Sequence, residues 1–513
     1  MSLIEIKVPA SISKALGLPQ SSVKRQQLRV LKKLLRKARF TQFGQQYRFD
    51  EILLSQHPDT KFQALVPTFN YNSIYKNWWY KTLEGTPDVC WPGKIKYYAL
   101  SSGTSEAASK YIPVTNDLLK GNKMAMIKQL IGLRNYEDVP LASISKGWLA
   151  LGGSTDLQRG EAGYFAGDLS GITAKKAPIW FQPFYKPGKA ISKEKDWNKK
   201  LQEIVEKAPS WDIGFLVGVP AWIQMCVEMI IKRYNLNTIH DLWPNLAFFV
   251  HGGVSFEPYK KGFEKLMGKP IIYIETYLAS EGFIAYQDKQ KAKGMRLVTN
   301  QHIFFECVPF DDVNFDADGE MIANPKALML HEVEEGKDYA LLISTSAGTW
   351  RYLIGDTIRF IDKARSEIVI TGRTKHFLSL VGEHLSVDNM NKAIQLVSEQ
   401  LNVSIPEFTV TGEPFHNFFA HHWYIACNDV VDANEIKKLI DQQLCILNDD
   451  YAVERRSALK EVLVTTLPEK TFMDFMKAKG KIGGQHKFPR VLKGQMLTDW
   501  KQFLSGGVLP KEF

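Results

Sequence analysis

Residues 99–115 read ALSSGTSEAASKYIPVT, a run rich in serine and threonine between two more regular segments. Upstream, residues 94–100 have the partial alternation and the aromatic side chains of a strand. Downstream, residues 111–114 are short and apolar, and Thr115 predicts the N-cap of a helix that begins before Leu118. We therefore expect the middle of the stretch to be a loop held between two ordered flanks.

A loop of this composition offers what a phosphate group needs. Backbone N–H groups can point into one concavity, and the hydroxyl groups add further donors. A Walker A loop would close with Gly-Lys-Ser/Thr, whereas Ala108 stands five residues after Gly103. This excludes a P-loop NTPase. Taken alone, the run is more typical of an ordinary turn than of a phosphate-binding loop.

The composition indicates a globular protein with a mild basic excess. The 513 residues allow a large core and two or three domains, and 65 Lys and Arg against 55 Asp and Glu give a net charge of +10. The five cysteines form no Cys-x-x-Cys or Cys/His ligand pattern, which predicts a reducing cytoplasm and no structural zinc. The N-terminus lacks the basic start and apolar core of an export signal.

Two segments suggest membrane or nucleic-acid binding at first sight. Residues 213–231 are apolar, but Pro220, Gln224 and Glu228 interrupt them, so we expect a strand and turn followed by a buried helix, and no membrane span. Residues 24–39 carry leucines at helical spacing among basic residues. A solvated face on a packed helix explains this pattern, and nucleic-acid binding is the alternative.

Helical and strand-like segments alternate through the first 370 residues, which predicts an α/β fold. We expect strands at 211–219, 246–251 and 270–275, and helices at 221–234 and 258–267. Residues 359–373 read RFIDKARSEIVITGR, a strand pair followed by a Gly-Arg bend, and a fresh pattern of helices and strands begins at Ser386. The simplest interpretation places a domain boundary near residues 372–376.

Several catalytic motifs are incomplete. No Gly-x-Ser-x-Gly elbow occurs, and the Ser-x-x-Lys pairs have no Lys-Thr-Gly to support them. Residues 331–335 resemble His-Glu-x-x-His but end in Glu, which removes the second zinc ligand. His421 and His422 alternate along a probable strand and cannot face one metal, so we interpret them as ordinary strand residues.

Three further motifs could accompany the serine-rich loop. In YIETYLASEGF, Tyr277, Ser280 and Glu281 follow an apolar run, where a strand end could present a ring and a carboxylate. In AGTWRYLIGDTIRF, Asp356 follows a glycine, where its carboxylate could accept two ribose hydroxyls. In TGRTKHF, Arg373 and Lys375 add positive charge. Each motif alone also has a purely structural explanation.

The order of these motifs is more specific than any one of them. SSGTS, YLASE, RYLIGD and TGRTKHFLSLVGEHLS together resemble the ATP-binding motif series of adenylate-forming enzymes, the superfamily of acyl-CoA synthetases and luciferases. More narrowly, the chain is similar to the GH3 family of acyl acid-amido synthetases. That narrower match rests on GVPAW at 218–222, HGGV at 251–254, FECVP at 305–309, AGTWRY at 347–352 and GQHKFPR at 484–490.

The resemblance implies a two-domain architecture and a two-step reaction. A large α/β domain, residues 1–372, would bind ATP and an acyl acid, and a small α+β lid, residues 373–513, would move about a hinge near residues 373–376. A carboxylic acid would attack the α-phosphate of ATP, and an amine, expected to be an amino acid, would then displace AMP to form an amide. Positioning and electrostatics would supply most of the catalysis.

The resemblance also assigns roles to individual residues. Lys487 would reach the reacting α-phosphate, and Glu281 would hold Mg²⁺. Asp356 would bind the ribose hydroxyls, helped by Arg373. The remaining ATP contacts would come from Ser101, Ser102, Gly103, Thr104 and Ser105 around the phosphates, from Gly252, Gly253, Val254 and Tyr277 around the adenine, and from Ser280 and Lys375.

The sequence departs from the family pattern in the loop. Glu106, Ala107 and Ala108 stand where family members usually carry glycines. Residues 143–207 match nothing in the hormone-conjugating members, which leaves the acid and the amine open. An acyl-CoA synthetase with the same first step is one alternative, and a nucleotide- or nucleic-acid-binding protein without ligase turnover is another.

Overall fold

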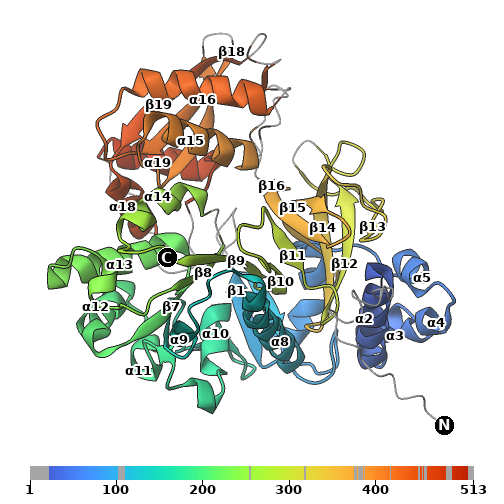
Figure 1. Cartoon of the computed structure of the whole chain (residues 1–513). Coiled ribbons are helices and arrows are strands. Elements are labelled where there is room, and N and C mark those ends of the chain that lie inside the picture. The colour runs from blue at the N-terminus through green and yellow to red at the C-terminus, as the bar shows by residue number, and fades with distance from the viewer. Residues whose placement is uncertain are drawn as a thin grey trace.

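The computed structural model describes residues 22–101, 110–253, 256–316, 319–374, 387–415, 418–448, 459–480 and 488–506, together with residues 378, 385, 451, 452 and 455. It contains a large domain built on a 12-stranded and a 4-stranded sheet, and a smaller domain built on a 3-stranded sheet (Figure 1). This confirms the predicted α/β architecture with a large N-terminal and a small C-terminal domain.

The N-terminal segment is helical and packs against the large sheet. Its elements are α2 (Val23–Ala38), α3 (Gln42–Gln46), α4 (Phe49–Leu54), α5 (Pro58–Leu65), α6 (Tyr71–Ile74), the π-helical turn η1 (Tyr75–Trp79) and α7 (Tyr80–Leu83). In α2, Leu31, Leu34 and Leu35 are buried and Leu28 is partly buried, while most of the basic side chains are exposed. The predicted packed helix with a solvated basic face is confirmed.

One half of the 12-stranded sheet is parallel. Its strands are β3 (Gly147–Ala150), β6 (Tyr185–Lys186), β7 (Ile213–Gly218), β8 (Phe248–Gly252) and β9 (Ile272–Ala279), and helices α13 (Pro220–Tyr234) and α14 (Glu257–Lys265) connect β7, β8 and β9. These elements match the predicted ones within a few residues. Residues 213–231 form a strand and the greater part of α13, and no described helix is long and apolar enough to cross a membrane.

The other half of the sheet is antiparallel. It contains β10 (Gly282–Tyr286), β11 (Met295–Leu297), β12 (Ile303–Pro309), β13 (Leu328–Met329), β14 (Asp338–Thr345), β15 (Thr349–Asp362) and β16 (Glu367–Arg373). The prediction that helices alternate with strands up to residue 370 is wrong here, since the described residues between α14 and Arg373 contain no helix. Strands such as β14 are buried on both faces and therefore lack the alternation typical of antiparallel strands.

The 4-stranded sheet carries the flanks of the serine-rich loop. Its order is β2-β1-β5-β4, with β1 (Tyr97–Ser101), β2 (Lys110–Val114), β4 (Gln158–Arg159) and β5 (Phe165–Gly167). Helix α8 (Asn116–Gly132) follows β2, and the Thr115 hydroxyl accepts a hydrogen bond of 3.0 Å from the Leu118 amide, as predicted for the N-cap. The remaining helices of this region are η2 (Leu133–Asn135), α9 (Leu141–Ile144), α10 (Leu169–Lys175), η3 (Ile179–Phe181), α11 (Lys189–Ser192), α12 (Trp197–Lys207), η4 (Ala208–Ser210) and η5 (Ile239–Asp241).

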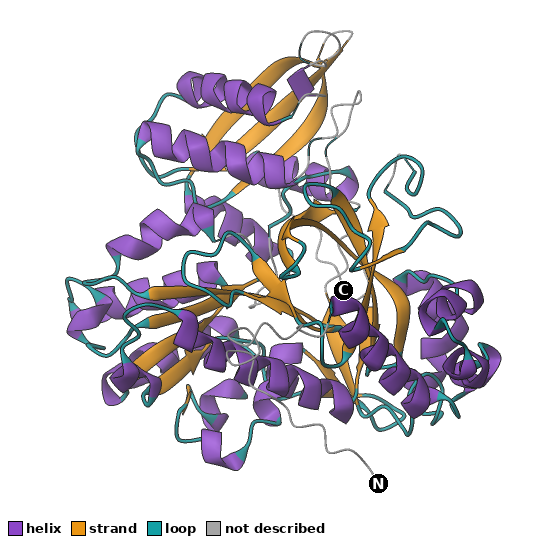
Figure 2. Ribbon diagram, turned by 45° about the vertical axis from the view of Figure 1, so that its right-hand side comes forward, coloured by secondary structure: helices purple, strands orange, loops and turns teal. Residues whose placement is uncertain are grey.

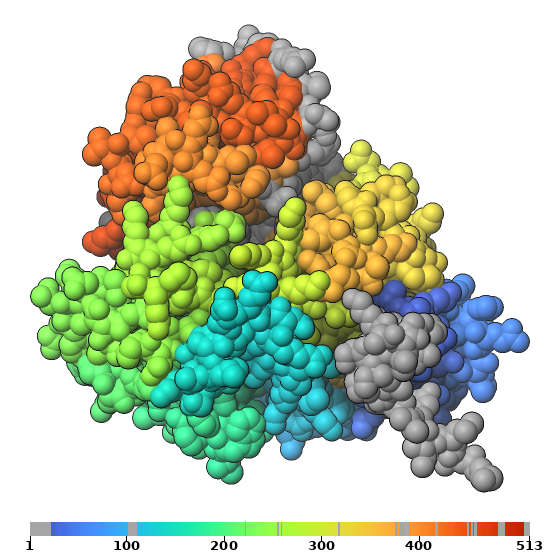
Figure 3. Space-filling view, in the orientation of Figure 1, coloured from blue at the N-terminus to red at the C-terminus, as the bar shows by residue number. Residues whose placement is uncertain are grey.

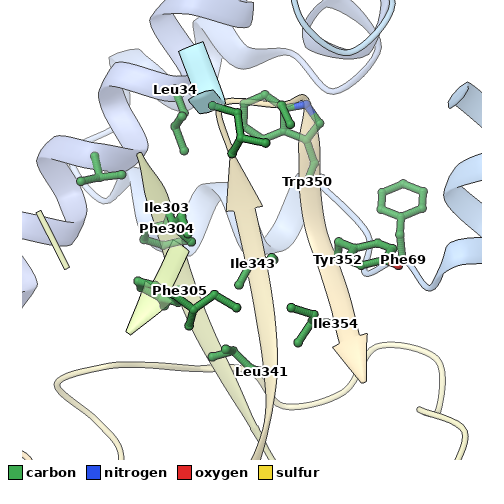
Figure 4. Close-up of a cluster of buried hydrophobic side chains, with 14 of the residues drawn as sticks. Leu34, Phe69, Ile303, Phe304, Phe305, Leu341, Ile343, Trp350, Tyr352 and Ile354 are labelled. Atoms are coloured by element: carbon green, nitrogen blue, oxygen red, sulfur yellow. The ribbon is translucent and has the colours of Figure 1, made fainter. Parts of the chain in front are cut away.

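Trp350 anchors the largest core cluster, which lies between the N-terminal helices and the antiparallel half of the sheet (Figure 4). Its ring contacts Phe43, Phe49 and Phe62, and its indole N–H donates to the Cys90 carbonyl at 3.1 Å. Aromatic side chains bury a large apolar area each. This cluster fixes β14 and β15 against the helical segment that precedes them in sequence.

The small domain has the order β17-β18-β19 in its sheet and helices packed against it (Figure 2). Its elements are α15 (Val387–Leu401), β17 (Phe408–Phe415), β18 (Phe418–Ala426), α16 (Ala433–Leu447), β19 (Leu459–Leu467), α18 (Glu469–Ala478) and α19 (Gly494–Leu504). It has its own apolar clusters, centred on Trp423 and on Trp500. In β18, His421 is buried and His422 stacks on Tyr424, which agrees with their interpretation as strand residues.

The small domain contacts the large domain above α14, which Figure 3 shows as the green surface below the orange one. The Tyr259 hydroxyl donates to Glu407 at 3.4 Å, and the Lys261 ammonium donates to the Ser398 carbonyl at 3.2 Å. Arg490 pairs with the same Glu407 carboxylate and lies over the Phe408 ring. One carboxylate thus joins α14, β17 and the described segment that begins at residue 488.

Candidate functional site

The parallel and antiparallel halves of the large sheet meet where β9 turns into β10. Tyr277 is the third residue from the end of β9, and Ser280 and Glu281 form the turn that leads into β10. Tyr277 is 6% and Glu281 is 7% exposed. Ligands of parallel α/β sheets bind at the carboxyl ends of the strands. The YLASE motif therefore lies where such a sheet is expected to present functional groups.

Asp356 and Arg373 are brought to the same place by the pairing of β15 with β16. They are direct partners in the antiparallel register, and the Arg373 Nε lies 3.0 Å from the Asp356 Oδ1. The Tyr277 hydroxyl donates a hydrogen bond to the Asp356 Oδ2. Residues from the YLASE, RYLIGD and TGRTKHF motifs are thus joined in one hydrogen-bonded group.

Gly355 shapes the strand beside this group. Its φ of +88° lies in the left-handed region that glycine adopts without strain. Its carbonyl accepts a hydrogen bond of 2.9 Å from the Thr374 amide, and a Cβ at this position would lie 3.5 Å from an Arg373 guanidinium nitrogen. The Gly-Asp pair therefore turns the backbone so that Asp356 and Arg373 share one site.

Burial and neighbouring charges perturb the titration of the group. Burial raises the pKa of Tyr277 well above its usual range, and the Asp356 carboxylate adds to this effect. The Asp356 carboxylate in turn raises the pKa of Arg373. Burial raises the pKa of Glu281 to about 7, with a further contribution from Asp356. Perturbed pKa values of this kind are common at functional sites.

Two residues that the sequence analysis did not single out complete the surroundings of Glu281. Burial raises the pKa of Tyr352 far above its usual range, and the Glu281 charge adds to it. The Lys110 ammonium lowers the pKa of Glu281 and lies 5.4 Å from the centre of the Tyr71 ring. Lys110 is the first residue of β2, so the downstream flank of the serine-rich loop lies near Glu281. Tyr352 was visible only as part of the RYLIGD motif.

The HGG part of the HGGV motif lies at the end of β8, next to β9. Gly252 pairs with Thr276, and a Cβ on Gly252 would lie 2.1 Å from the Thr276 carbonyl oxygen. Only glycine permits this close approach, which places Gly252 and Gly253 one strand away from Tyr277. His251 is buried beside Phe256, and burial lowers its pKa to about 3, so its ring is neutral.

Part of the predicted site lies outside the described residues. Ser101 ends β1 and is described by its backbone. The predicted residues outside the described part of the chain are Ser102, Gly103, Thr104, Ser105, Val254, Lys375 and Lys487. The structure brings together Tyr277, Ser280, Glu281, Asp356 and Arg373, with Gly252 and Gly253 on the neighbouring strand.

A site with the single carboxylate ligand Glu281 fits a magnesium ion whose other ligands are mainly phosphate oxygens. No group of three or more His, Cys, Asp and Glu ligands occurs among the residues that the structure describes. Mg²⁺ often binds through one or two carboxylates together with substrate phosphates and water. The buried Glu281 carboxyl group would supply a single protein ligand of this kind, since a bound cation favours its ionised form, which burial disfavours.

The fold is shared with solved structures of an acyl acid amido synthetase and an acyl-CoA ligase. The chain aligns with the structure of GH3.15 acyl acid amido synthetase with a TM-score of 0.75 and 16% identity, over 98% of this chain and 96% of that one. It aligns with 2-hydroxyisobutyryl-CoA ligase with a TM-score of 0.60 and 12% identity, over 95% and 94% of the two chains. These likenesses establish the fold.

The family follows from the sequence. The GH3 family N-terminal, central and C-terminal domains match residues 16–205, 296–371 and 388–495. The chain belongs to the GH3 family, which confirms the resemblance drawn from the motifs.

Two curated relatives illustrate the range of the family. Indole-3-acetic acid-amido synthetase GH3.4 of Arabidopsis thaliana is 26% identical over 341 residues, which are 62% of this chain and 52% of that protein. Jasmonoyl--L-amino acid synthetase JAR6 of Nicotiana attenuata is 22% identical over 430 residues, which are 69% of this chain and 72% of that protein. The chain thus spans about half the length of the first of these relatives.

Proposed function

We propose that this protein is an ATP-dependent acid-amido synthetase. It would adenylate a carboxylic acid, release pyrophosphate, and transfer the acyl group to the amine of an amino acid with release of AMP. Membership in the GH3 family supports this proposal, as do the amido synthetase names of the relatives. The observation that carries it is the group in which Tyr277 and Arg373 both hold the Asp356 carboxylate, with Glu281 buried beside it.

This group suits the recognition of a nucleoside triphosphate. Among the described residues, each carboxylate oxygen of Asp356 has one donor, and it retains capacity to accept a ribose hydroxyl. Tyr277 and Arg373 would fix the orientation of that carboxylate before ATP arrives, which reduces the cost of ordering it on binding. The Tyr277 ring and the Gly252-Gly253 backbone would flank the adenine.

The charged part of ATP would lie toward Glu281 and the serine-rich loop. Residues 101–105 would donate to the phosphates, and Lys110 marks where the chain leaves this loop. Glu281 would hold Mg²⁺, which supplies charge neutralisation at the triphosphate when bound. Lys375 and Lys487 would add positive charge, with Lys487 at the reacting α-phosphate.

Domain closure would separate the two half-reactions. We place the boundary between residues 372 and 373 and the hinge at residues 373–376. This is supported by the end of β16 at Arg373, the start of α15 at Val387, and the separate core of the small domain. The contact between Tyr259 and Glu407 would have to break if the small domain rotates.

The five cysteines form no disulfide bond, which supports a reducing compartment such as the cytoplasm. An acyl-CoA synthetase remains the second candidate, since the likeness to 2-hydroxyisobutyryl-CoA ligase extends over nearly the whole chain. The names of the amido synthetase relatives favour the amide product.

The decisive experiment is acid-dependent ATP–pyrophosphate exchange with Mg²⁺ across aryl, indolyl and aliphatic carboxylic acids. Amine and CoA are left out at first. Exchange with one class of acid would establish adenylation, and addition of the 20 amino acids or of CoA would then identify the acceptor by mass spectrometry of the product. ATP binding without exchange, together with salt-sensitive binding to nucleic acid, would overturn the proposal.

A further inference from the structure

The turn that carries Glu281 is held by a side chain from another part of the fold. Asn122 lies in the middle of α8 and is 4% exposed. Its Oδ1 accepts a hydrogen bond of 2.9 Å from the Phe283 amide and lies 3.0 Å from the His302 Nε2. Phe283 is the second residue after Glu281, so α8 is bonded to the start of β10, directly after the turn.

His302 fills the space between this helix and this turn. A Cβ on Gly121 would lie 2.3 Å from the His302 Cγ, and a Cβ on Gly282 would lie 3.6 Å from its Nε2. The imidazole ring therefore lies against Gly121 of α8 on one side and close to Gly282 on the other. Gly282 is bonded to Glu281, so the ring lies close to the backbone that leaves the turn.

The hydrogen bonds define the protonation of the pair. Because the Phe283 amide is a donor, the atom of Asn122 that it meets is the oxygen. That oxygen only accepts, so the His302 Nε2 carries the proton. Burial lowers the pKa of His302 to about 4, with smaller contributions from Lys33 and Lys128, and the ring is neutral near pH 7.

Sheet pairing closes the turn, since Gly282 pairs with Ala279 and Phe283 with Leu278, but the register of β9 with β10 shifts between Phe283 and Ala285. The Asn122 oxygen therefore bonds the last paired residue before this irregularity. The pair also leaves the Asn122 Nδ2 and the His302 Nδ1 buried and without a hydrogen-bond partner among the described residues. Each such atom costs stability. Apolar side chains at positions 122 and 302 would avoid this cost, so stability alone does not explain the pair.

We propose that Asn122 and His302 are positioning residues that hold the Glu281 carboxylate at the magnesium and triphosphate site. The inference rests on the proposed function, because it assigns the pair to the ligand that Glu281 would bind. Loss of the Asn122 oxygen would free the Phe283 amide and the His302 ring together. The turn would then relax, and Glu281 would no longer be oriented for the ion.

The test measures binding of a non-hydrolysable ATP analogue by calorimetry, with Mg²⁺ and with EDTA. Removing a partner that orients a metal ligand typically costs roughly 10- to 100-fold in metal affinity. We expect Asn122→Leu to weaken magnesium-dependent binding by about tenfold and to leave binding in EDTA unchanged. Asn122→Asp keeps an oxygen that can accept hydrogen bonds from the Phe283 amide and the His302 Nε2. This variant should bind the analogue with Mg²⁺ within about threefold of the unaltered protein.

Gln27→Leu is the matched control. Gln27 is also a buried helical amide, and its Oε1 accepts a hydrogen bond of 2.7 Å from the Phe305 amide. Its Nε2 donates to the Thr299 and Ile303 carbonyls, and none of these partners belongs to the Glu281 turn. This variant should lower the melting temperature without changing the magnesium dependence. If Asn122→Leu does not fold, His302→Leu compared with His302→Gln tests the same contact.

The outcomes separate the inference from the proposed function. Equal weakening with and without Mg²⁺, or no weakening, in Asn122→Leu would overturn the positioning role. The same magnesium-specific loss in Gln27→Leu would also overturn it. Failure of the unaltered protein to bind the analogue with Mg²⁺ would instead overturn the proposed function itself.

Discussion

Arg351 and Glu306 form a buried ion pair between β15 and β12, in which the Arg351 Nε lies 3.1 Å from both carboxylate oxygens. Their side chains are 6% and 1% exposed. Arg351 also donates to the Gln63 and Val66 carbonyls at 3.1 and 2.6 Å, and the Gln63 amide donates to Glu306 at 2.9 Å. The pair therefore ties the antiparallel strands to the end of helix α5.

Breaking this pair should destabilise the large domain. Removal of one partner from a buried, hydrogen-bonded ion pair typically costs about 3–5 kcal/mol, because the other charge is left unpaired. We expect Glu306→Gln to lower stability by about this amount in urea unfolding followed by tryptophan fluorescence. In contrast, Asp338→Asn breaks the ion pair between Asp338 and Arg359, and the side chains of these two residues are each about one third exposed. That control should cost less than about 1 kcal/mol, and equal losses would contradict the assignment.

Asp356 should determine the affinity for ATP. Its carboxylate is held by Tyr277 and Arg373, so Asp356→Asn removes the charge and one acceptor without removing the side chain. Hydrogen bonds to charged groups contribute about 1.5–3 kcal/mol, which corresponds to a loss of roughly 10- to 100-fold in ATP affinity. Calorimetry of ATP binding measures this effect. Asp362→Asn in the same strand, where the side chain is 39% exposed, should leave the affinity unchanged.

The motifs predicted the family correctly, whereas the predicted alternation of helices and strands fails between α14 and Arg373. Tyr277, Glu281, Asp356 and Arg373 were identified from the sequence, because family motifs mark positions whose chemistry is constrained. Their contact could not be derived, because it depends on the register of β15 with β16 and on the sheet order.

Other motif residues proved to be structural. Glu306 and Arg351 lie in two of the family motifs, yet they form a buried ion pair between neighbouring parts of the core. Sequence alone does not distinguish a buried charge that binds a ligand from one that is neutralised by another residue far along the chain. Asn122 and His302 lie in none of the quoted motifs, and their contact is set by the packing of α8.

Glu275 should make the protein less stable as the pH rises. Glu275 of β9 lies opposite His251 of β8 in the backbone register of the parallel sheet. Burial raises the pKa of Glu275 from 4.5 to about 7, and the charge of Glu257 contributes to the rise. Between pH 4.5 and 7 the folded state therefore binds more protons than the unfolded state. Stability falls as the pH rises through this window, since ionisation of the part-buried carboxyl is unfavourable in the folded state.

The variant Glu275→Gln isolates this contribution. We expect the loss of stability between pH 5.5 and pH 8 to be smaller in the variant by about 2 kcal/mol, since one pKa unit corresponds to about 1.36 kcal/mol. Thermal unfolding at both pH values measures the difference. Glu264→Gln, at an exposed position of α14, should retain the full pH dependence of the unaltered protein. An unchanged pH dependence in Glu275→Gln would contradict the prediction.

Lys487 should act in the first half-reaction and not in the second. An ammonium on a flexible stem can follow the charge that develops on the α-phosphate during attack by the carboxylate. Lys487→Met should therefore reduce ATP–pyrophosphate exchange by at least about 100-fold, the scale expected when a group that stabilises transition-state charge is removed. Amide formation from a preformed acyl-adenylate should change by less than about threefold.

Lys477→Met provides the control, because Lys477 lies exposed in the last turn of α18, ten residues before Lys487 in the same domain. It should leave both half-reactions intact. Equal losses of exchange and of amide formation in Lys487→Met would show that this lysine supports the fold or both steps alike, and would remove it from the α-phosphate. Loss of amide formation alone would instead place it in the orientation that the small domain adopts for amine attack.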